Sequence, residues 1–140
     1  MTRPRTSIHR ELFGILGSFE GASKLQAEWN AYFSEHGIDA FMDRYPCKRE
    51  QIPERLSEMF HFDRRLYILS PSLRDTVAPL LDRADGNHVD VIINKDGIQS
   101  GMYCDAIEKT PKELLEVFCK VGGPGIRIPR PPCCIPSDCR

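Results

Sequence analysis

Apolar residues along this chain form short runs that are separated by segments with helical periodicity. The runs at residues 12–17, 38–45 and 66–69 have the length and the apolar or alternating composition of strands. Between them, residues 23–37 and 51–60 carry apolar side chains three and four positions apart, which indicates helices with one buried face. The first half of the chain therefore predicts alternating strands and helices.

The first two helices carry start and stop signals of their own. Ser23, with Gln26 three positions later, is expected to cap the first helix, and Gly37 is expected to end it. Pro53 falls where the first turn of a second helix tolerates proline. The expected inner faces are Leu25, Trp29, Tyr32 and Phe33 in the first helix, and Leu56, Met59 and Phe60 in the second.

The strand at residues 66–69 runs directly into Ser70 and Pro71. Four apolar residues followed by this pair are typical of a buried strand that delivers its carboxyl end to a helix. We therefore expect a third helix after Pro71, at the kind of strand end where open α/β sheets bind ligands. Its predicted inner face is Leu73, Val77, Leu80 and Leu81.

The second half of the chain contains the clearest hairpin signal. Residues 89–94 and 98–104 flank an Asp-Gly pair, which permits the positive φ angles of a tight hairpin turn. A last helix is expected from Pro111, and its inward residues are Leu114, Leu115, Phe118 and Cys119. The order β-α-β-α-β-α-β-β-α predicts an α/β fold, a three-layer sandwich with a mixed sheet.

Length and charge set the frame for function. The 140 residues suffice for one domain, which we place at residues 11–120, after a lead-in at 1–10 and before a Gly/Pro/Cys-rich tail at 121–140. The 19 Lys and Arg residues nearly balance the 20 Asp and Glu residues, so no nucleic acid or membrane partner is indicated. We find no apolar leader or membrane-spanning run, and expect a cytoplasmic protein.

Three of the six cysteines, Cys133, Cys134 and Cys139, crowd the tail. Zinc and redox sites need sulfurs at spacings that let them converge, such as C-x-x-C, and this tail does not have that spacing. The histidines are scattered and do not match a ligand pattern either. We therefore expect no metal site, and we interpret the tail as a disordered linker or a truncated remnant.

Four short segments occur in a fixed order: residues 17–25 (GSFEGASKL), 67–73 (YILSPSL), 87–91 (NHVDV) and 95–105 (KDGIQSGMYCD). In that order they resemble the motifs G-x-x-x-x-H-S-x-S, N-V-T-x-P-x-K, G-A-V-N-T and x-D-G-x-x-x-G-x-N-T-D. These motifs belong to the N-terminal, substrate-binding domain of shikimate dehydrogenase. The resemblance extends over about residues 12–106 and implies the fold of that domain.

The resemblance assigns roles to individual residues. It places Ser23 at a substrate-binding serine, Asp90 at a substrate-binding asparagine, and Asp105 at the catalytic aspartate, which also contacts substrate. Leu25 replaces the second serine, and Leu73 stands at the position of the catalytic lysine. In the family, the lysine and the aspartate form the acid–base pair for hydride transfer to NADP, and a leucine cannot move a proton.

The cofactor half of the family is not matched. The Gly122-Gly123-Pro124-Gly125 string has the look of a dinucleotide-binding turn, but prolines follow it where the turn would need a helix. We expect no cofactor site in this chain, and NADP is implied only by the family. Two carboxylates at Asp90 and Asp105 would also make a pocket acidic, which disfavours an anionic ligand.

The sequence thus predicts a degenerate shikimate-dehydrogenase-like domain that binds a small hydroxylated cyclic acid or cyclitol around Ser23, Asp90 and Asp105. We expect little or no shikimate 3-dehydrogenase (NADP+) activity from it alone. One alternative is the substrate half of a bipartite NADP-dependent shikimate or quinate oxidoreductase, with a separate NADP-binding domain or as a homodimer. Another is a protein-interaction module on the same scaffold. Without the resemblance, Ser23 is only a helix cap and Asp105 only a loop acid.

Overall fold

A mixed sheet of six strands forms the centre of the computed structural model, which describes residues 10–122 and their side chains as far as Phe118. The strand order is β2-β1-β3-β5-β6-β4. The first three neighbours are parallel, whereas β5 runs antiparallel to both β3 and β6. The strands are β1 (Glu11–Leu16), β2 (Ala40–Tyr45), β3 (Arg64–Leu69), β4 (Arg83–Ala84), β5 (Val91–Lys95) and β6 (Ile98–Met102).

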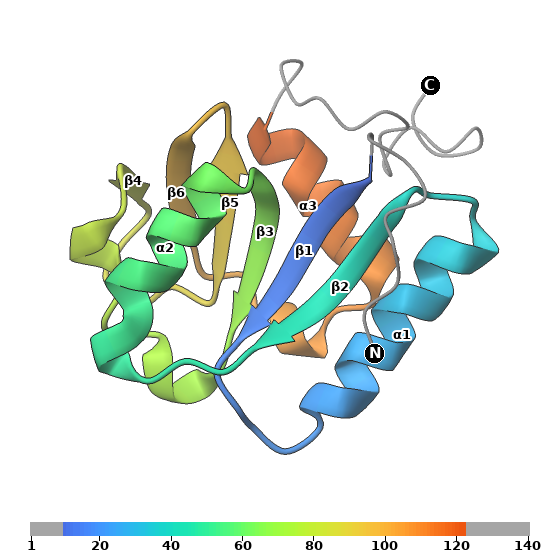
Figure 1. Ribbon diagram of the computed structural model, residues 1–140, viewed down its shortest axis with the longest axis horizontal. Helices are drawn as coiled ribbons and strands as arrows, with labels where there is room; N and C mark the ends of the chain where they lie inside the picture. The colour runs from blue at the N-terminus through green and yellow to red at the C-terminus, as the bar shows by residue number, and fades with distance from the viewer. Residues whose placement is uncertain (1–9, 123–140) are drawn as a thin grey trace.

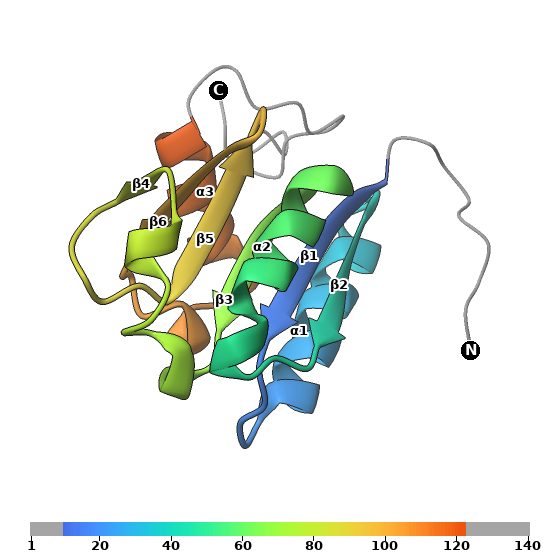
Figure 2. The same cartoon turned by 60° about the vertical axis from the view of Figure 1, so that its left-hand side comes forward.

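Helices cover the two faces of the sheet. Helices α1 (Ala22–Glu35) and α3 (Pro111–Gly122) pack on one face, and α2 (Ile52–His61) packs on the other, in front of the sheet in Figure 1. Figure 2 shows the same layers from the side of β4. The predicted α/β sandwich with a part-parallel, part-antiparallel sheet is confirmed.

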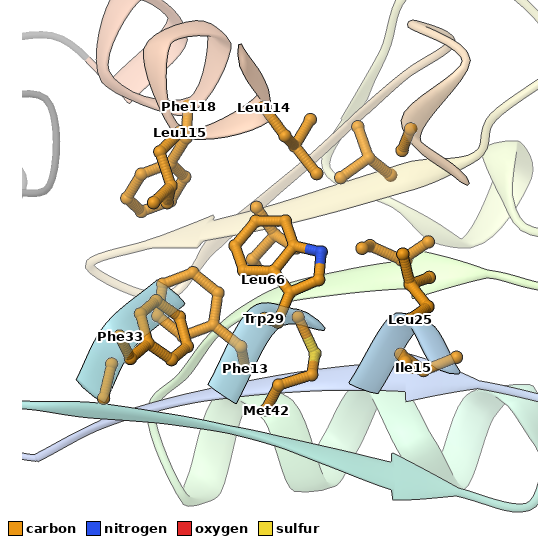
Figure 3. Packing of buried hydrophobic residues seen from close by; sticks show 14 of the residues in the cluster. Phe13, Ile15, Leu25, Trp29, Phe33, Met42, Leu66, Leu114, Leu115 and Phe118 are labelled. Atoms are coloured by element: carbon orange, nitrogen blue, oxygen red, sulfur yellow. The ribbon is translucent and has the colours of Figure 1, made fainter. Parts of the chain in front are cut away.

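The larger core lies between the sheet and the α1/α3 layer (Figure 3). Trp29 is fully buried there, and its ring packs edge-on to Phe33 at a centroid distance of 5.7 Å. The ring centroid of Phe13, from β1, lies 6.0 Å from the ring centroids of both Trp29 and Phe118. The inner faces predicted for the first and last helices are therefore correct where the structure describes them; the side chain of Cys119 lies outside the described residues.

The helix predicted after Pro71 is wrong. Two separate 3₁₀ turns, Pro71–Leu73 and Ala78–Leu80, occupy this segment, followed by the short strand β4, which the sequence did not predict. Pro79 explains the difference, because a proline in a helix interior removes a hydrogen bond and its ring collides with the preceding turn. Leu73 and Val77 are still buried, but Leu80 is 48% exposed.

The α2 face has its own apolar cluster, which includes Ile52, Leu56 and Met59. Phe60, predicted on the inner face of this helix, is instead 55% exposed. Its ring lies over the β5–β6 turn, where a methyl group added at Gly97 would come 2.8 Å from the Phe60 Cε1 atom. The helical spacing assigned Phe60 to the buried face of α2, whereas its side chain lies outside the apolar cluster.

The hairpin prediction is confirmed. β5 and β6 pair antiparallel around Asp96 and Gly97, whose φ angles are +52° and +86°. Both residues thus adopt the left-handed conformation that a tight turn with this twist requires.

Helix α3 begins with a reciprocal cap. The Glu113 backbone N–H donates to Thr110 Oγ1 at 3.2 Å, and the Thr110 backbone N–H donates to Glu113 Oε1 at 2.9 Å. The helix extends to Gly122, two residues past the predicted end of the domain at residue 120, and the rest of the predicted tail at 121–140 lies outside the described residues. In the described part, no helix has the length and apolar character to cross a bilayer.

The outer edge of β2 is closed by side chains of α1. Asn30 accepts a hydrogen bond from the Met42 backbone N–H at 2.8 Å and donates one to the Met42 carbonyl at 3.0 Å. Gln26 donates a further hydrogen bond to the same carbonyl at 3.2 Å. The Asn30 amide therefore occupies the hydrogen-bonding groups that a further strand would use at Met42.

Candidate functional site

One edge of the sheet collects the segments that the sequence singles out. Because β1, β2 and β3 are parallel and β5 is antiparallel to β3 and β6, the carboxyl ends of β1, β2, β3 and β6 meet the amino end of β5 at this edge. Helix α1 begins there too, below the sheet in Figure 1. Ser23, Ser70, Asp90 and Asp105 therefore all come from segments at one edge.

Asp90 lies just before β5, and its side chain is 0% exposed. Its Oδ1 atom accepts a hydrogen bond from the Cys104 backbone N–H at 2.9 Å, and its Oδ2 atom accepts one from the Ala106 backbone N–H at 2.6 Å. The backbone of Asp90 is paired on both sides as well, with Leu69 at 2.9 Å and Met102 at 3.0 Å. The carboxylate therefore holds the loop after β6, and the acidic pocket expected from two facing carboxylates does not form.

Asp105 lies on that loop, between the two residues that Asp90 binds. Its φ angle is +59°, a left-handed conformation in which aspartate is enriched among non-glycine residues. Its side chain is exposed, and Tyr103 lies with its hydroxyl 3.5 Å from Asp105 Oδ1. The loop thus presents a carboxylate at the sheet edge, on a backbone that buried hydrogen bonds hold in place.

Ser23 does not cap α1, contrary to the prediction. The cap position is Gly21, with a φ angle of +93°, and Ser23 lies in the first turn of the helix as an exposed residue. Its Oγ atom accepts a hydrogen bond from Arg44 Nη1 at 2.7 Å. Gln26 does not complete a capping box either, because its amide binds the edge strand. The Ser23 hydroxyl is thus already paired with a cation at the end of β2.

The corner after β3 is closely packed. Ser70 is buried, and its backbone N–H donates to the Leu16 carbonyl at 2.9 Å. A methyl group added at Gly17 would overlap Ser70 Oγ and lie 3.1 Å from Leu73 Cδ1. Leu73, at the lysine position of the resemblance, is 2% exposed and belongs to the α2-side core. This position points into the protein and not toward the sheet edge.

The sequence did not single out a cluster that lies beside Asp105. His88 Nδ1 lies 2.6 Å from Asp75 Oδ1, and the His88 ring lies 4.9 Å from the ring of Tyr103. The Arg74 guanidinium lies 5.5 Å from the centroid of the same Tyr103 ring. The sequence could have pointed to this cluster only through the positions of its residues. Arg74 follows Leu73 at the corner after β3, and His88 precedes Asp90 by two residues.

Cys104 lies between Tyr103 and Asp105, and its thiol is not a ready nucleophile. Burial, together with the nearby Asp90 carboxylate, raises the pKa of the Cys104 thiol to about 11. The thiol is therefore protonated at neutral pH, and a protonated thiol is a poor nucleophile. Among residues 10–122, no three histidine, cysteine or acidic side chains gather in a way that could hold a metal ion.

Neither a protein-family model nor a curated protein matches this chain. Solved structures do match. Shikimate 5-dehydrogenase from Thermus thermophilus, in complex with shikimate, is 24% identical with a TM-score of 0.60, over 81% of this chain and 43% of that one. The Listeria monocytogenes enzyme, in complex with shikimate and NAD, is 18% identical with a TM-score of 0.63, over 72% and 37%.

A third match is 5-ketofructose reductase of Gluconobacter sp. strain CHM43, which is 16% identical with a TM-score of 0.65, over 82% of this chain and 42% of that one. The chain spans less than half the length of each of these proteins. At these identities the likeness establishes architecture. The chain has the fold of the substrate-binding domain of shikimate dehydrogenase.

Proposed function

We propose that this domain binds a small hydroxylated cyclic acid or cyclitol at the carboxyl edge of its sheet. Asp105 would accept a hydrogen bond from a ring hydroxyl of the ligand, and the Ser23 hydroxyl would lie at the α1 side of the same edge. Asp90 would act by holding the loop of Asp105 in place. The proposal is supported by the fold shared with shikimate dehydrogenases and by the polar groups gathered at this edge.

The observation that carries the proposal is the construction of the Asp105 loop. The Asp90 carboxylate is fully buried and binds two backbone N–H groups of one loop. Burying a carboxylate costs desolvation free energy, which an ordinary surface turn does not require. The result is an exposed carboxylate at a fixed position, on a left-handed residue. Functional residues are commonly held in sparsely populated backbone conformations of this kind.

We further propose that the domain alone has little or no dehydrogenase activity. A general acid–base group typically contributes about 10²- to 10⁴-fold to a rate, and a buried aliphatic side chain occupies the lysine position. In the βα turn after β1, Ser70 and Leu73 fill the space beside Gly17, so this turn is not open to a ligand there. We therefore assign no cofactor contact to residues 10–122.

A second candidate is the substrate half of a bipartite NADP-dependent oxidoreductase. It is favoured by the neighbours in complex with NAD or NADP+, since the matched part is less than half of each of those chains. A nicotinamide cofactor held by a separate domain would supply the hydride acceptor, and this chain would bind and orient the substrate. Adding such a domain would then produce NADP-dependent oxidation of shikimate or quinate.

A third candidate, a protein-interaction module, is favoured by a different observation. Phe60 and Phe62 are exposed around the carboxyl end of α2, away from the Asp105 loop. This candidate predicts that the domain binds no small molecule at the sheet edge.

A thermal-shift titration distinguishes the first two candidates from the third, because a ligand that binds only the folded state raises the melting temperature. The probes are shikimate, quinate, dehydroshikimate and uncharged cyclitols. Asp105→Asn should lose the shift, whereas Asp96→Asn should keep it. Asp96 is a matched control because it is also exposed and left-handed, but lies at the opposite edge of the sheet. No shift with any probe in the unmodified protein refutes the proposal.

A further inference from the structure

Arg74 is a cation without a counter-charge at the candidate site. It is half-buried, and its Nε atom is fully buried without a hydrogen-bond partner. Among the described residues, Arg74 forms no ion pair, whereas Arg55, Arg64 and Arg65 all contact carboxylates. A guanidinium that has lost part of its hydration and gained no anion remains a strong unsatisfied donor.

Two of the acidic residues at this part of the edge, Asp75 and Asp90, already have close polar partners. Asp75 lies 2.6 Å from His88 Nδ1, and Asp90 is buried with both oxygens bound to backbone N–H groups. Asp105 is exposed, and its nearest described partner is the Tyr103 hydroxyl, at 3.5 Å. Tyr103 therefore lies between a cation without a counter-charge and an exposed carboxylate.

This arrangement suits a ligand with an oxyanion and hydroxyl groups. The planar guanidinium forms strong, charge-assisted hydrogen bonds to carboxylate and phosphate oxygens, and its terminal nitrogens are not among the buried unpaired atoms. The Asp105 carboxylate accepts hydrogen bonds from hydroxyl groups. Tyr103 offers a half-exposed ring between the two, on which a carbon ring can pack.

We infer that Arg74 and Tyr103 form an oxyanion subsite, which holds a carboxylate or phosphate group of the ligand at the β3–β6 side of the sheet edge. The rival position for the anion is the start of α1, where the exposed Arg44 guanidinium donates to the Ser23 hydroxyl. This inference rests on the proposed function, which places a ligand at this edge. The inference narrows the ligand of the proposed function to an anion, so uncharged cyclitols are not the preferred class of ligand.

The test measures dissociation constants for inorganic phosphate, shikimate and myo-inositol by NMR titration. Arg74→Gln should weaken phosphate and shikimate binding by about 10- to 100-fold, the effect of losing hydrogen bonds to a charged group. Arg74→Lys keeps the positive charge but loses the planar guanidinium with its paired N–H groups, and should weaken binding by a smaller factor than Arg74→Gln. Arg44→Gln removes the guanidinium at the rival position and should change the constants by less than about twofold, because the subsite assigns the anion to Arg74.

The outcomes separate the two proposals. The subsite is overturned if Arg44→Gln loses binding and Arg74→Gln does not. It is also overturned if myo-inositol binds more tightly than both anions. In either case the proposal that the sheet edge binds a ligand still stands. If none of the three probes binds the unmodified protein, both proposals fail. A hydroxylated sugar phosphate added to the panel shows which oxyanion the subsite prefers, since stronger binding than shikimate identifies phosphate.

Discussion

The Asp90 carboxylate offers the most direct test of how the site is built. Replacing Asp90 by Asn keeps the shape of the side chain but leaves one oxygen where there were two. At most one of the two backbone hydrogen bonds, 2.9 Å to Cys104 and 2.6 Å to Ala106, can then survive. The other backbone N–H faces an amide N–H₂ group, which is also a donor.

The magnitude follows from burial. Losing one charge-assisted hydrogen bond and leaving its donor unpaired in the interior costs about 1.5–3 kcal/mol. A neutral amide is cheaper to bury than a carboxylate, which offsets part of that loss. We expect Asp90→Asn to lower the free energy of unfolding by about 2 kcal/mol, which for a domain of this size lowers the melting temperature by about 8 °C.

Urea unfolding followed by tryptophan fluorescence measures this effect, because Trp29 is the single tryptophan and is fully buried. Hydrogen exchange should quicken at the amides of Cys104 and Ala106 beyond the global change. Asp105→Asn is the matched control: it makes the same chemical change on an exposed, left-handed residue and should alter stability by less than about 0.5 kcal/mol. An Asp90→Asn protein as stable as the original would refute the account of the loop.

Three further predictions follow from single side chains. Leu73→Lys should destabilise the domain by roughly 3 kcal/mol or more in the same urea assay and should not create dehydrogenase activity, because it buries a cation in the α2-side core. Alkylation of Cys104 by iodoacetamide, followed by peptide mass spectrometry, should be slow at pH 8, and its rate should reach half the maximum near pH 11. A half-maximal rate near pH 9 would contradict the burial of the thiol. Asn30→Ala should cost about 1–3 kcal/mol by leaving the Met42 backbone N–H unpaired at the sheet edge, and equal stability would show that this N–H needs no side-chain partner.

The same Cys104 pKa predicts how stability depends on pH. The pKa of the thiol is raised from an ordinary value of 9.0 to about 11 in the folded protein, so folding favours the protonated form. The contribution to stability is therefore complete below about pH 9 and is lost between pH 9 and pH 11. Tyr45 acts in the same direction at higher pH, since burial raises its pKa to about 12.

Local signals in the sequence predicted the elements that depend on neighbouring residues. The Asp96-Gly97 turn and the start of the last helix at Pro111 both depend on adjacent residues, and both occur as expected. The segment after Pro71 failed because apolar spacing was weighed without Pro79, which no helix interior accommodates. Ser23 failed for a similar reason: Gly21, two residues earlier, accepts the left-handed conformation that starts the helix.

The candidate site depended on contacts that no local pattern contains. The burial of Asp90 follows from the antiparallel pairing of β5 with β3 and β6, and its two hydrogen-bond partners are 14 and 16 residues away. A motif comparison can place Asp90 near Asp105, but it cannot show that one carboxylate supports the loop of the other. Sequence reasoning therefore placed both acids in the pocket, whereas Asp90 is buried and Asp105 is exposed.

The corner after β3 shows why a motif position can mislead about charge. The Pro71–Leu73 turn is 3₁₀, and successive residues of such a turn differ in direction by about 120°. Leu73 points into the α2-side core, whereas the next side chain, Arg74, reaches across to Tyr103 at the sheet edge. A comparison that stops at Leu73 concludes that the edge has lost its cation. The geometry instead places a guanidinium one residue further along the turn, facing Tyr103, and this is the cation on which the proposed oxyanion subsite depends.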